Sequence, residues 1–221
     1  MPVGYLPVED RWIALDVGET LIDETRIWAV WADVLGIPRL TLMAALGAEV
    51  ANGGDHRTAF ELVGEPNWRE RFEEVEAAYG GFQADDLYSD ALPTVQRLCK
   101  TGYRVAILAN QPARRTAELH ALGFEPDVMA MSDELKVHKP DLAFFRRGLE
   151  LMGAPEPGQV AYVGDRVDND VVPSAAAGMR PVWVRRGPWG VIQELPADLN
   201  PRPMVVDTLD ELVSRIDELW D

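Results

Sequence analysis

Cysteine is almost absent from this chain and histidine is scarce. The single cysteine, Cys99, excludes an intramolecular disulfide and a thiolate metal cluster. The three histidines, His56, His120 and His138, do not pair at the three- or four-residue spacing at which two imidazoles share a metal on one helix. The sequence therefore gives no sign of a site built on thiolate or paired imidazole ligands.

Long apolar runs and an excess of basic residues are also missing. No run of about 18 apolar residues occurs, so there is no candidate membrane span, and residues 1–11 lack the basic-then-apolar layout of a signal peptide. The 37 acidic residues outnumber the 21 basic ones, with a formal net charge of −16. Nucleic acid is disfavoured because neutralising its phosphates requires a basic face. We expect a cytoplasmic monomer or homodimer that acts on a small molecule.

Short apolar runs that end in polar residues recur along the 221 residues. Six of them are predicted to be buried strands: residues 12–15, 104–109, 128–131, 160–163, 181–184 and 204–206. Apolar residues at helical spacing lie between the runs, for example over 142–152 and 209–220. Strands that alternate with helices predict an α/β fold with a doubly wound, mostly parallel, Rossmann-like sheet.

The stretch from residue 23 to residue 89 breaks this alternation. Its apolar residues follow helical spacing, as around Trp31 and Trp68, and glycine pairs at 53–54 and 80–81 interrupt the pattern. No segment within it has a convincing strand pattern. We therefore expect an inserted, all-α cap domain over 23–89, and a core domain formed by 1–22 and 90–221.

Polar residues follow several of the predicted strands. Asp16 and Asn110 each end an apolar run, and Asp165 follows another. Because ligands of such sheets bind beyond the carboxyl ends of the strands, these side chains are candidates for one site. Taken singly they remain ambiguous, since Asp16 also suits a glycine turn and Asn110 also suits a helix cap.

Two further motifs carry charge toward the same region. Lys139 precedes Pro140, which suits the first turn of a helix. The lysine either points its own ammonium group into a site or is a solvated loop residue. Asp165, Asp168 and Asp170 are closely spaced after a strand. Such acids suit Mg²⁺, which takes hard oxygen ligands, although an acidic loop that caps a helix would have the same spacing.

Together, the four motifs resemble those of the haloacid dehalogenase-like hydrolases with a helical cap. The family pattern is Asp-x-Asp-x-Thr after the first strand, Ser, Thr or Asn after the second, Lys-Pro-Asp, and Gly-Asp-x-x-x-Asn-Asp followed by Ala-Gly-Met. This chain has the corresponding residues at 16–20, 110, 139–141, 164–170 and 177–179. The resemblance covers nearly the whole chain.

The resemblance implies a role for each matching residue. Asp16 would be the nucleophile that forms a covalent aspartyl intermediate, while Asn110 and Lys139 would bind and neutralise the transferring group. Lys139 would also keep Asp16 ionised. The implied cofactor is Mg²⁺, and its implied ligands are Asp16, the carbonyl oxygen of Gly18, Asp165 and Asp170.

Gly18 departs from the pattern of the family's phosphatases. Those enzymes carry a second Asp two residues after the nucleophile, which protonates the leaving alkoxide and then activates water. Glycine cannot transfer a proton, and this loss removes a contribution of roughly a hundredfold to ten-thousandfold in rate. The neighbouring Glu19 is one candidate to replace it, although a solvent-facing turn residue would look the same.

The resemblance favours a Mg²⁺-dependent phosphatase of a small phosphorylated metabolite. The predicted substrate contacts are Thr20, Asn110, Gln111 and Arg26. Because of Gly18, two alternatives remain open: a dehalogenase- or phosphonatase-type hydrolase, whose leaving group needs no comparable protonation, and a binding or regulatory protein that has lost turnover.

Overall fold

The computed structural model describes residues 8–220. Six strands form one parallel sheet in the order β3-β2-β1-β4-β5-β6. Their bounds are β1 Trp12–Leu15, β2 Arg104–Ala109, β3 Val128–Met131, β4 Val160–Gly164, β5 Arg180–Val184 and β6 Met204–Val206. The predicted α/β fold is confirmed, and each predicted strand matches the observed one to within one residue at either end.

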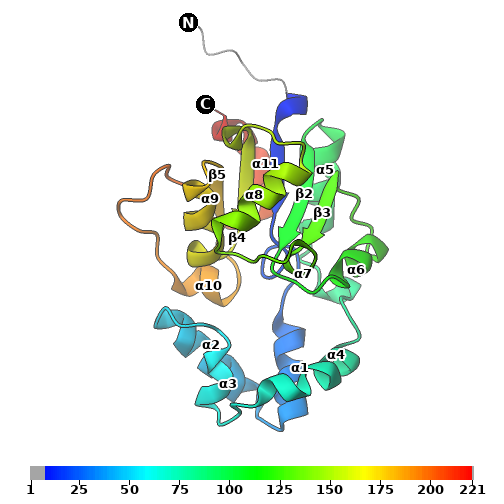
Figure 1. The fold of residues 1–221 in the computed structure, drawn as a ribbon, viewed down its shortest axis with the longest axis vertical. Helices are drawn as coiled ribbons and strands as arrows, with labels where there is room; N and C mark the ends of the chain where they lie inside the picture. Colours follow the sequence, from blue (N-terminus) through cyan, green and yellow to red (C-terminus); the bar gives the residue numbers. More distant parts are fainter. Residues whose placement is uncertain (1–7, 221) are drawn as a thin grey trace, which may run out of the picture.

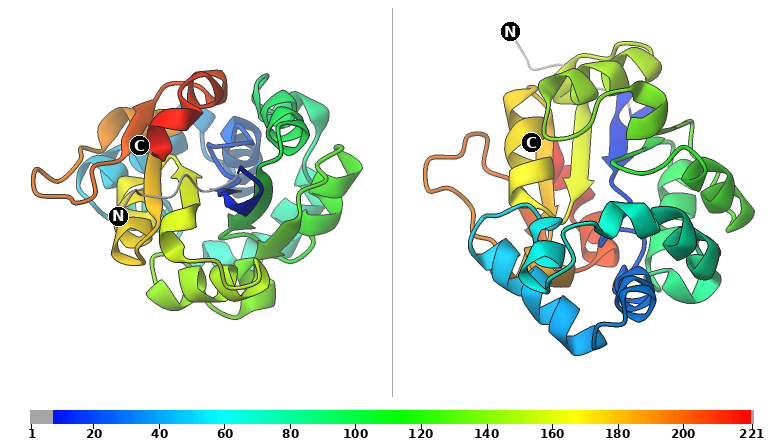
Figure 2. Two further views of the ribbon diagram at one scale, coloured as in Figure 1. Left: turned by 90° about the horizontal axis from the view of Figure 1, so that it is seen from above. Right: turned by 60° about the horizontal axis from the view of Figure 1, so that its bottom comes forward.

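Helices cover both faces of the sheet (Figure 2). Those that follow the cap region are α5 Ala91–Lys100, α6 Arg115–Ala121, α7 Ser132–Leu135, α8 Leu142–Leu151, α9 Val172–Ala176, α10 Gly187–Ile192 and α11 Leu209–Ser214. Strand β1 is buried on both sides, as expected for a central parallel strand. Ile13 and Leu15 pack in one core with residues of α5 and α11, and Trp12 and Ala14 pack in the other with residues of α8.

The helices between β1 and α5 form a separate lobe beyond the carboxyl ends of the strands (Figure 1). They are α1 Thr25–Leu35, α2 Arg39–Ala51, α3 Thr58–Leu62 and α4 Phe72–Tyr79. Their shared core contains Trp28, Trp31, Phe60 and Trp68, and residues 23–89 contain no named strand. The helical character predicted for this stretch is observed, while its boundaries as a domain remain a prediction.

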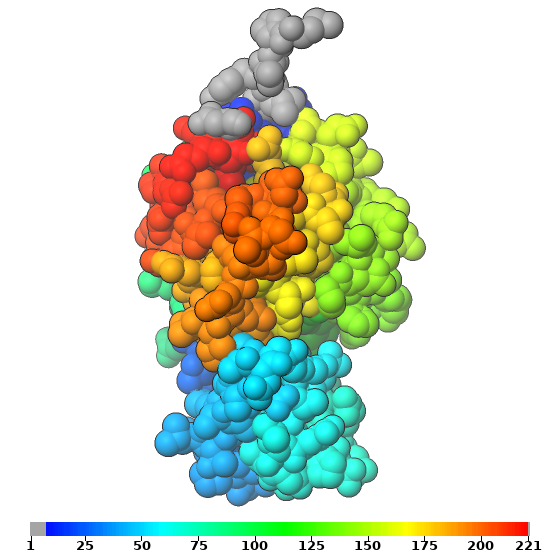
Figure 3. All heavy atoms as spheres, turned by 90° about the vertical axis from the view of Figure 1, so that its left-hand side faces the viewer, coloured from blue at the N-terminus to red at the C-terminus, as the bar shows by residue number. Residues whose placement is uncertain are grey.

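The helical lobe meets the larger body at α10. Trp189 of α10 belongs to the same apolar cluster as the helices of the lobe, and α10 contacts α2. In the space-filling view the segment around α10 lies directly above the lobe (Figure 3). This contact helps to place the lobe over the end of the sheet.

Two details complete the fold. The helix expected over 209–220 ends as α-helix at Ser214, and a 3₁₀ turn over Ile216–Leu219 follows it. Among residues 8–220, no single helix is long and apolar enough to cross a membrane; the bent pair α1 and α2, whose axes meet at 118°, passes that test by length and composition alone.

Candidate active site

Asp16 lies directly after the central strand. Its backbone N–H donates to the carbonyl of Val163 in β4 over 2.9 Å, so the residue continues the sheet by one step before the chain turns. Its side chain is buried at the floor of a cavity. Because β1 runs between β2 and β4, residues that follow all three strands converge around this carboxylate.

Lys139 is the cation nearest to this carboxylate among the described ion pairs. Its Nζ lies 2.7 Å from Asp16 Oδ1 and 2.6 Å from Asp170 Oδ1, and its side chain is fully buried. Burial lowers the pKa of Lys139, but Asp16 and Asp170 raise it more, so its pKa lies well above the usual value. The ammonium is therefore charged and favours the ionised form of Asp170.

Asn110, which follows β2, holds the backbone of Lys139. Its Nδ2 donates to the carbonyl of Lys139 over 2.9 Å, and its Oδ1 accepts from the N–H of Lys139 over 2.8 Å. The two hydrogen bonds fix the loop that carries the lysine. Asn110 lies on the cavity wall, but its side-chain amide is engaged with that loop, and its contact with the transferring group stays a prediction.

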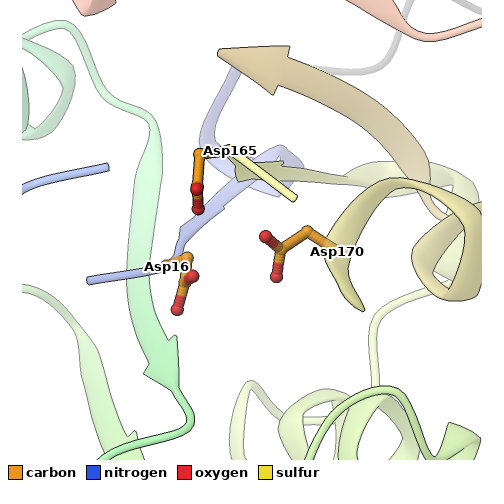
Figure 4. A group of neighbouring side chains, drawn as sticks. All are labelled: Asp16, Asp165 and Asp170. Atoms are coloured by element: carbon orange, nitrogen blue, oxygen red, sulfur yellow. The ribbon is translucent and has the colours of Figure 1, made fainter. Parts of the chain in front are cut away.

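Asp16, Asp165 and Asp170 offer oxygens that all lie within 4.8 Å of one another (Figure 4). The turn over Val167–Val171 is π-helical, a form often found at functional sites. It brings Asp170 back against Gly164, where an added Cβ would stand 2.4 Å from the carboxylate carbon. Gly164 is therefore required for this approach.

The electrostatics of the three acids indicate a site for a cation. Burial, then Asp170 and Asp16, raise the pKa of Asp165 well above its usual value. Burial also raises the pKa of Asp170 to about 6, although Lys139 lowers it. Asp165 Oδ2 is buried without a hydrogen-bond partner among the described residues, and such an atom is costly unless it is paired or binds metal. The residues present thus fit a divalent metal with oxygen ligands.

Asp168 lies outside this cluster. Its carboxylate pairs with Arg166 at 2.6 Å and accepts from Gln193, and its side chain is half exposed. The close spacing in the sequence therefore grouped one acid too many, since the π-helical turn directs Asp170 inward and Asp168 outward.

The cavity has a volume of about 550 Å³ and lies between the end of the sheet and the helical lobe. Its polar side includes Asp16, Gly18 and Lys136. Gln111, which comes after β2, also lies on its wall. The side formed by the lobe carries five aromatic side chains, Trp28, Trp31, Phe60, Trp68 and Phe72, together with polar residues that include His56, Arg57 and Glu76. The volume lies within the range typical of small-molecule sites.

Glu19 lines the cavity, but both oxygens of its carboxylate are held by other groups. Its Oε1 accepts from the N–H of Glu24 over 3.0 Å and its Oε2 accepts from the hydroxyl of Tyr88 over 2.5 Å. The same carboxylate packs where a Cβ on Gly187 would stand. With both oxygens engaged, the geometry does not support Glu19 as the replacement for the missing acid.

Glu24 is a site residue that the sequence reasoning missed. It lines the cavity, and Gln111 Nε2 donates to its Oε1 over 3.5 Å. Burial, then Glu19 and Asp16, raise the pKa of Glu24 to about 8, against a weaker opposing effect of Arg166. In the sequence it is one acid among several before a helix, and only the fold of the turn after Asp16 brings it to the site.

Two predicted substrate contacts need correction. Thr20 is fully buried, and its hydroxyl has no hydrogen-bond partner among the described residues. Neither Thr20 nor Arg26 is among the residues that line the cavity. The guanidinium of Arg26 instead forms two hydrogen bonds with Asp86, at 2.6 and 2.5 Å, and donates to the carbonyls of Tyr79 and Gly81. Arg26 therefore links α1 to residues 79–86, where the chain passes from the lobe back to the larger body.

Replacing Arg26 by methionine is expected to weaken the fold and leave substrate binding intact. The change would leave Asp86, which is 4% exposed, without its cation, at a cost of about 2 kcal/mol in the free energy of unfolding. Urea unfolding and KM for a phosphate ester are the measurements. Arg39→Met, which breaks an exposed ion pair with Asp33, is the control and should cost under about 1 kcal/mol. A raised KM with unchanged stability would restore the anion-binding role.

Comparison with known proteins decides the family. Residues 11–178 match the family model of the haloacid dehalogenase-like hydrolases, a range that contains Asp16, Lys139, Asp165 and Asp170. The chain belongs to this family of hydrolases. The resemblance inferred from the four motifs is thereby confirmed.

The curated relatives of this hydrolase include several phosphatases. A glyceraldehyde 3-phosphate phosphatase of Methanocaldococcus jannaschii is 29% identical over 135 residues, which cover 60% of this chain and 57% of the relative. A phosphoglycolate phosphatase of Aliivibrio fischeri is 29% identical over 186 residues, which cover 76% of this chain and 81% of the relative. The chain thus spans little more than half the length of the first of these.

Solved structures confirm the fold. An L-2-haloacid dehalogenase superimposes with a TM-score of 0.72 at 15% identity, covering 94% of this chain and 98% of the other. At this level of identity the likeness concerns the fold alone, and it does not distinguish a phosphatase from a dehalogenase.

Proposed function

We propose that this hydrolase is a Mg²⁺-dependent phosphatase of small phosphorylated metabolites, with Asp16 as its nucleophile. The observation that carries the proposal is the contact of Asp16 with Lys139 at 2.7 Å beside two further buried carboxylates. A carboxylate in contact with a buried ammonium suits attack on phosphorus, because the cation can neutralise charge on the phosphoryl group, and the acids around it suit a metal. The curated relatives named as phosphatases support the same reaction.

The residues of the site would divide the work as follows. Asp16 attacks the phosphorus through its free carboxylate oxygen, and Lys139 neutralises charge on the phosphoryl oxygens. Asp16, Asp165 and Asp170 would hold Mg²⁺, and the carbonyl of Gly18 remains a predicted fourth ligand. Bound there, the metal would offset the repulsion between the anionic nucleophile and the anionic phosphate.

The side chains of the cavity wall would contact the organic part of the substrate and so determine which esters are preferred. The aromatic side chains of the wall form stacked and tilted pairs, such as Trp28 with Phe60 at 5.6 Å between ring centroids. Such a wall favours an apolar or aromatic leaving group, because burying that surface is favourable while burying a polyol would leave hydroxyls unpaired. We therefore propose phosphate esters of compact apolar alcohols as the preferred class.

A metal-removal assay tests the function. With Mg²⁺, the protein is expected to release phosphate from para-nitrophenyl phosphate; EDTA should abolish this release and added Mg²⁺ should restore it. No release above background, together with metal-independent chloride release from a 2-haloacid, would establish the dehalogenase alternative. Tight binding of a phosphate ester with no turnover would establish the regulatory one.

A further inference from the structure

The turn after Asp16 leaves open the space that a side chain at position 18 would fill. An ideal Cβ built on Gly18 would stand 2.4 Å from Glu24 Oε1 and 2.9 Å from Glu24 Cδ. Both distances are far below a van der Waals contact. The carboxylate of Glu24 therefore occupies the volume next to Gly18 into which a longer residue would project.

We propose that Glu24 is the general acid and base of this hydrolase, entering from the start of α1 to supply the carboxyl group that Gly18 lacks. The inference rests on the proposed phosphatase function. The proton transfer is thereby assigned to a residue at the start of α1, whereas the nucleophile follows β1. This assignment also explains why position 18 is glycine, since a side chain there would displace the carboxyl group of Glu24.

The surroundings of Glu24 leave its carboxyl group available for this task. Glu24 is the N-cap residue of α1, yet its side chain makes no capping hydrogen bond. Its side-chain hydrogen-bond partners are two residues of the cavity wall: Gln111, which donates to Oε1 over a long 3.5 Å, and Trp28. Both oxygens of Glu19, in contrast, are engaged at 3.0 Å or less. The backbone N–H of Glu24 is held by Glu19, so Glu19 positions the residue that carries out the transfer.

The proton and electron balance of the reaction is complete with these groups. When Asp16 attacks phosphorus, the bond from phosphorus to the ester oxygen breaks, and its electron pair remains on that oxygen. The oxygen takes the proton of the Glu24 carboxyl group and leaves as an alcohol. The Glu24 carboxylate then removes a proton from water as the water oxygen attacks phosphorus, which releases phosphate and regenerates Asp16.

The dependence of rate on the leaving group tests the inference. Para-nitrophenolate leaves without help, whereas the alkoxide of benzyl phosphate, an ester of similar size, needs a proton. Glu24→Gln should lower kcat/KM for benzyl phosphate by roughly a hundredfold to ten-thousandfold and lower that for para-nitrophenyl phosphate far less. Asp168→Asn, the same change in an acid that pairs with Arg166 outside the carboxylate cluster, is the matched control, and any loss it causes should be equal for the two esters.

A relocation of the acid gives a second, independent test. In Gly18→Asp the new side chain meets Glu24, so this single variant should be impaired on both esters. In the double variant Gly18→Asp, Glu24→Ala the acid returns beside the nucleophile, and benzyl phosphate turnover should exceed that of Glu24→Ala at least tenfold, a gain of about 1.4 kcal/mol in transition-state stabilisation.

The outcomes separate the inference from the function on which it rests. If wild-type protein releases no phosphate from para-nitrophenyl phosphate, the phosphatase function fails and the inference fails with it. If the wild type is active but Glu24→Gln slows both esters equally, or slows neither, the function stands and the role of Glu24 is overturned. If the thermal unfolding temperature of Glu24→Gln equals that of the wild type, a selective loss of benzyl phosphate turnover reflects lost proton transfer and not a damaged fold.

Discussion

Asp16→Asn is expected to reduce phosphate ester turnover by at least about a thousandfold, since loss of the nucleophile in a covalent hydrolase costs up to roughly a millionfold in rate. The amide retains the shape of the side chain but cannot form the acyl phosphate at a useful rate. Its Oδ1 can still accept from Lys139, which lies 2.7 Å away, so the fold should persist. Steady-state kinetics and thermal unfolding with Mg²⁺ measure the two effects.

The matched control for this variant is Asp168→Asn. It makes the same change in an acid of the neighbouring loop that pairs with Arg166 and lies outside the carboxylate cluster. It should turn over close to the wild-type rate. Substantial activity in Asp16→Asn, on an ester that wild-type protein hydrolyses, would remove Asp16 from the mechanism.

Lys139→Met is expected to abolish turnover and also to destabilise the protein strongly. Methionine fits the volume, but it leaves Asp16 and Asp170 buried without their cation. Removing one partner of a buried ion pair costs about 3–5 kcal/mol, which should appear in urea unfolding without metal near neutral pH. Lys136→Met, a change to a lysine on the cavity wall rather than in the carboxylate cluster, is the control for stability.

The loss of stability in Lys139→Met should depend on pH in a defined direction. The pKa of Asp170 in the folded protein is about 6, raised from its usual 3.8, and Lys139 is a group that lowers it. An acid whose pKa is higher in the folded protein than in the unfolded chain stabilises the fold at pH values below its unfolded pKa. This stabilisation is lost as the pH rises through its folded pKa. Without Lys139, the pKa of Asp170 in the folded protein is raised further, because the cation that lowers it is gone. The loss of stability is then larger and continues to higher pH.

The difference between Lys139→Met and wild type should therefore be greater near neutral pH than at about pH 5, where Asp170 binds a proton instead of facing an absent cation. Unfolding curves of the two proteins in EDTA at both pH values provide the measurement. A difference that is independent of pH would show that the lysine stabilises the fold by packing alone.

The sheet and the centre of the site could be predicted from the sequence because their signals are local. A buried parallel strand is a continuous apolar run, and the residue after it must lie at the edge where ligands bind. This reasoning places Asp16, Asn110 and Asp165 at one edge, as the structure shows. The contact of Lys139 with Asp16 followed from the resemblance of the motifs to a known family.

The errors arose where position depends on side-chain direction rather than on order in the chain. Arg26 lies between the cavity residues Glu24 and Ile27 in the sequence, but its side chain turns toward Asp86. Glu19 is next to Gly18, yet the turn directs its carboxylate to Tyr88. Glu24 is farther along the chain and reaches Gly18 because the turn folds back, a contact that no periodicity or spacing encodes.

The covalent intermediate on Asp16 provides the most direct test of the account. Protein mixed with para-nitrophenyl phosphate and Mg²⁺ would be denatured rapidly and reduced with borohydride, which converts an aspartyl phosphate to homoserine. We expect mass spectrometry to find homoserine at position 16, dependent on both substrate and metal. Phosphate release with Asp16 unmodified, or with the label on another residue, would contradict the account.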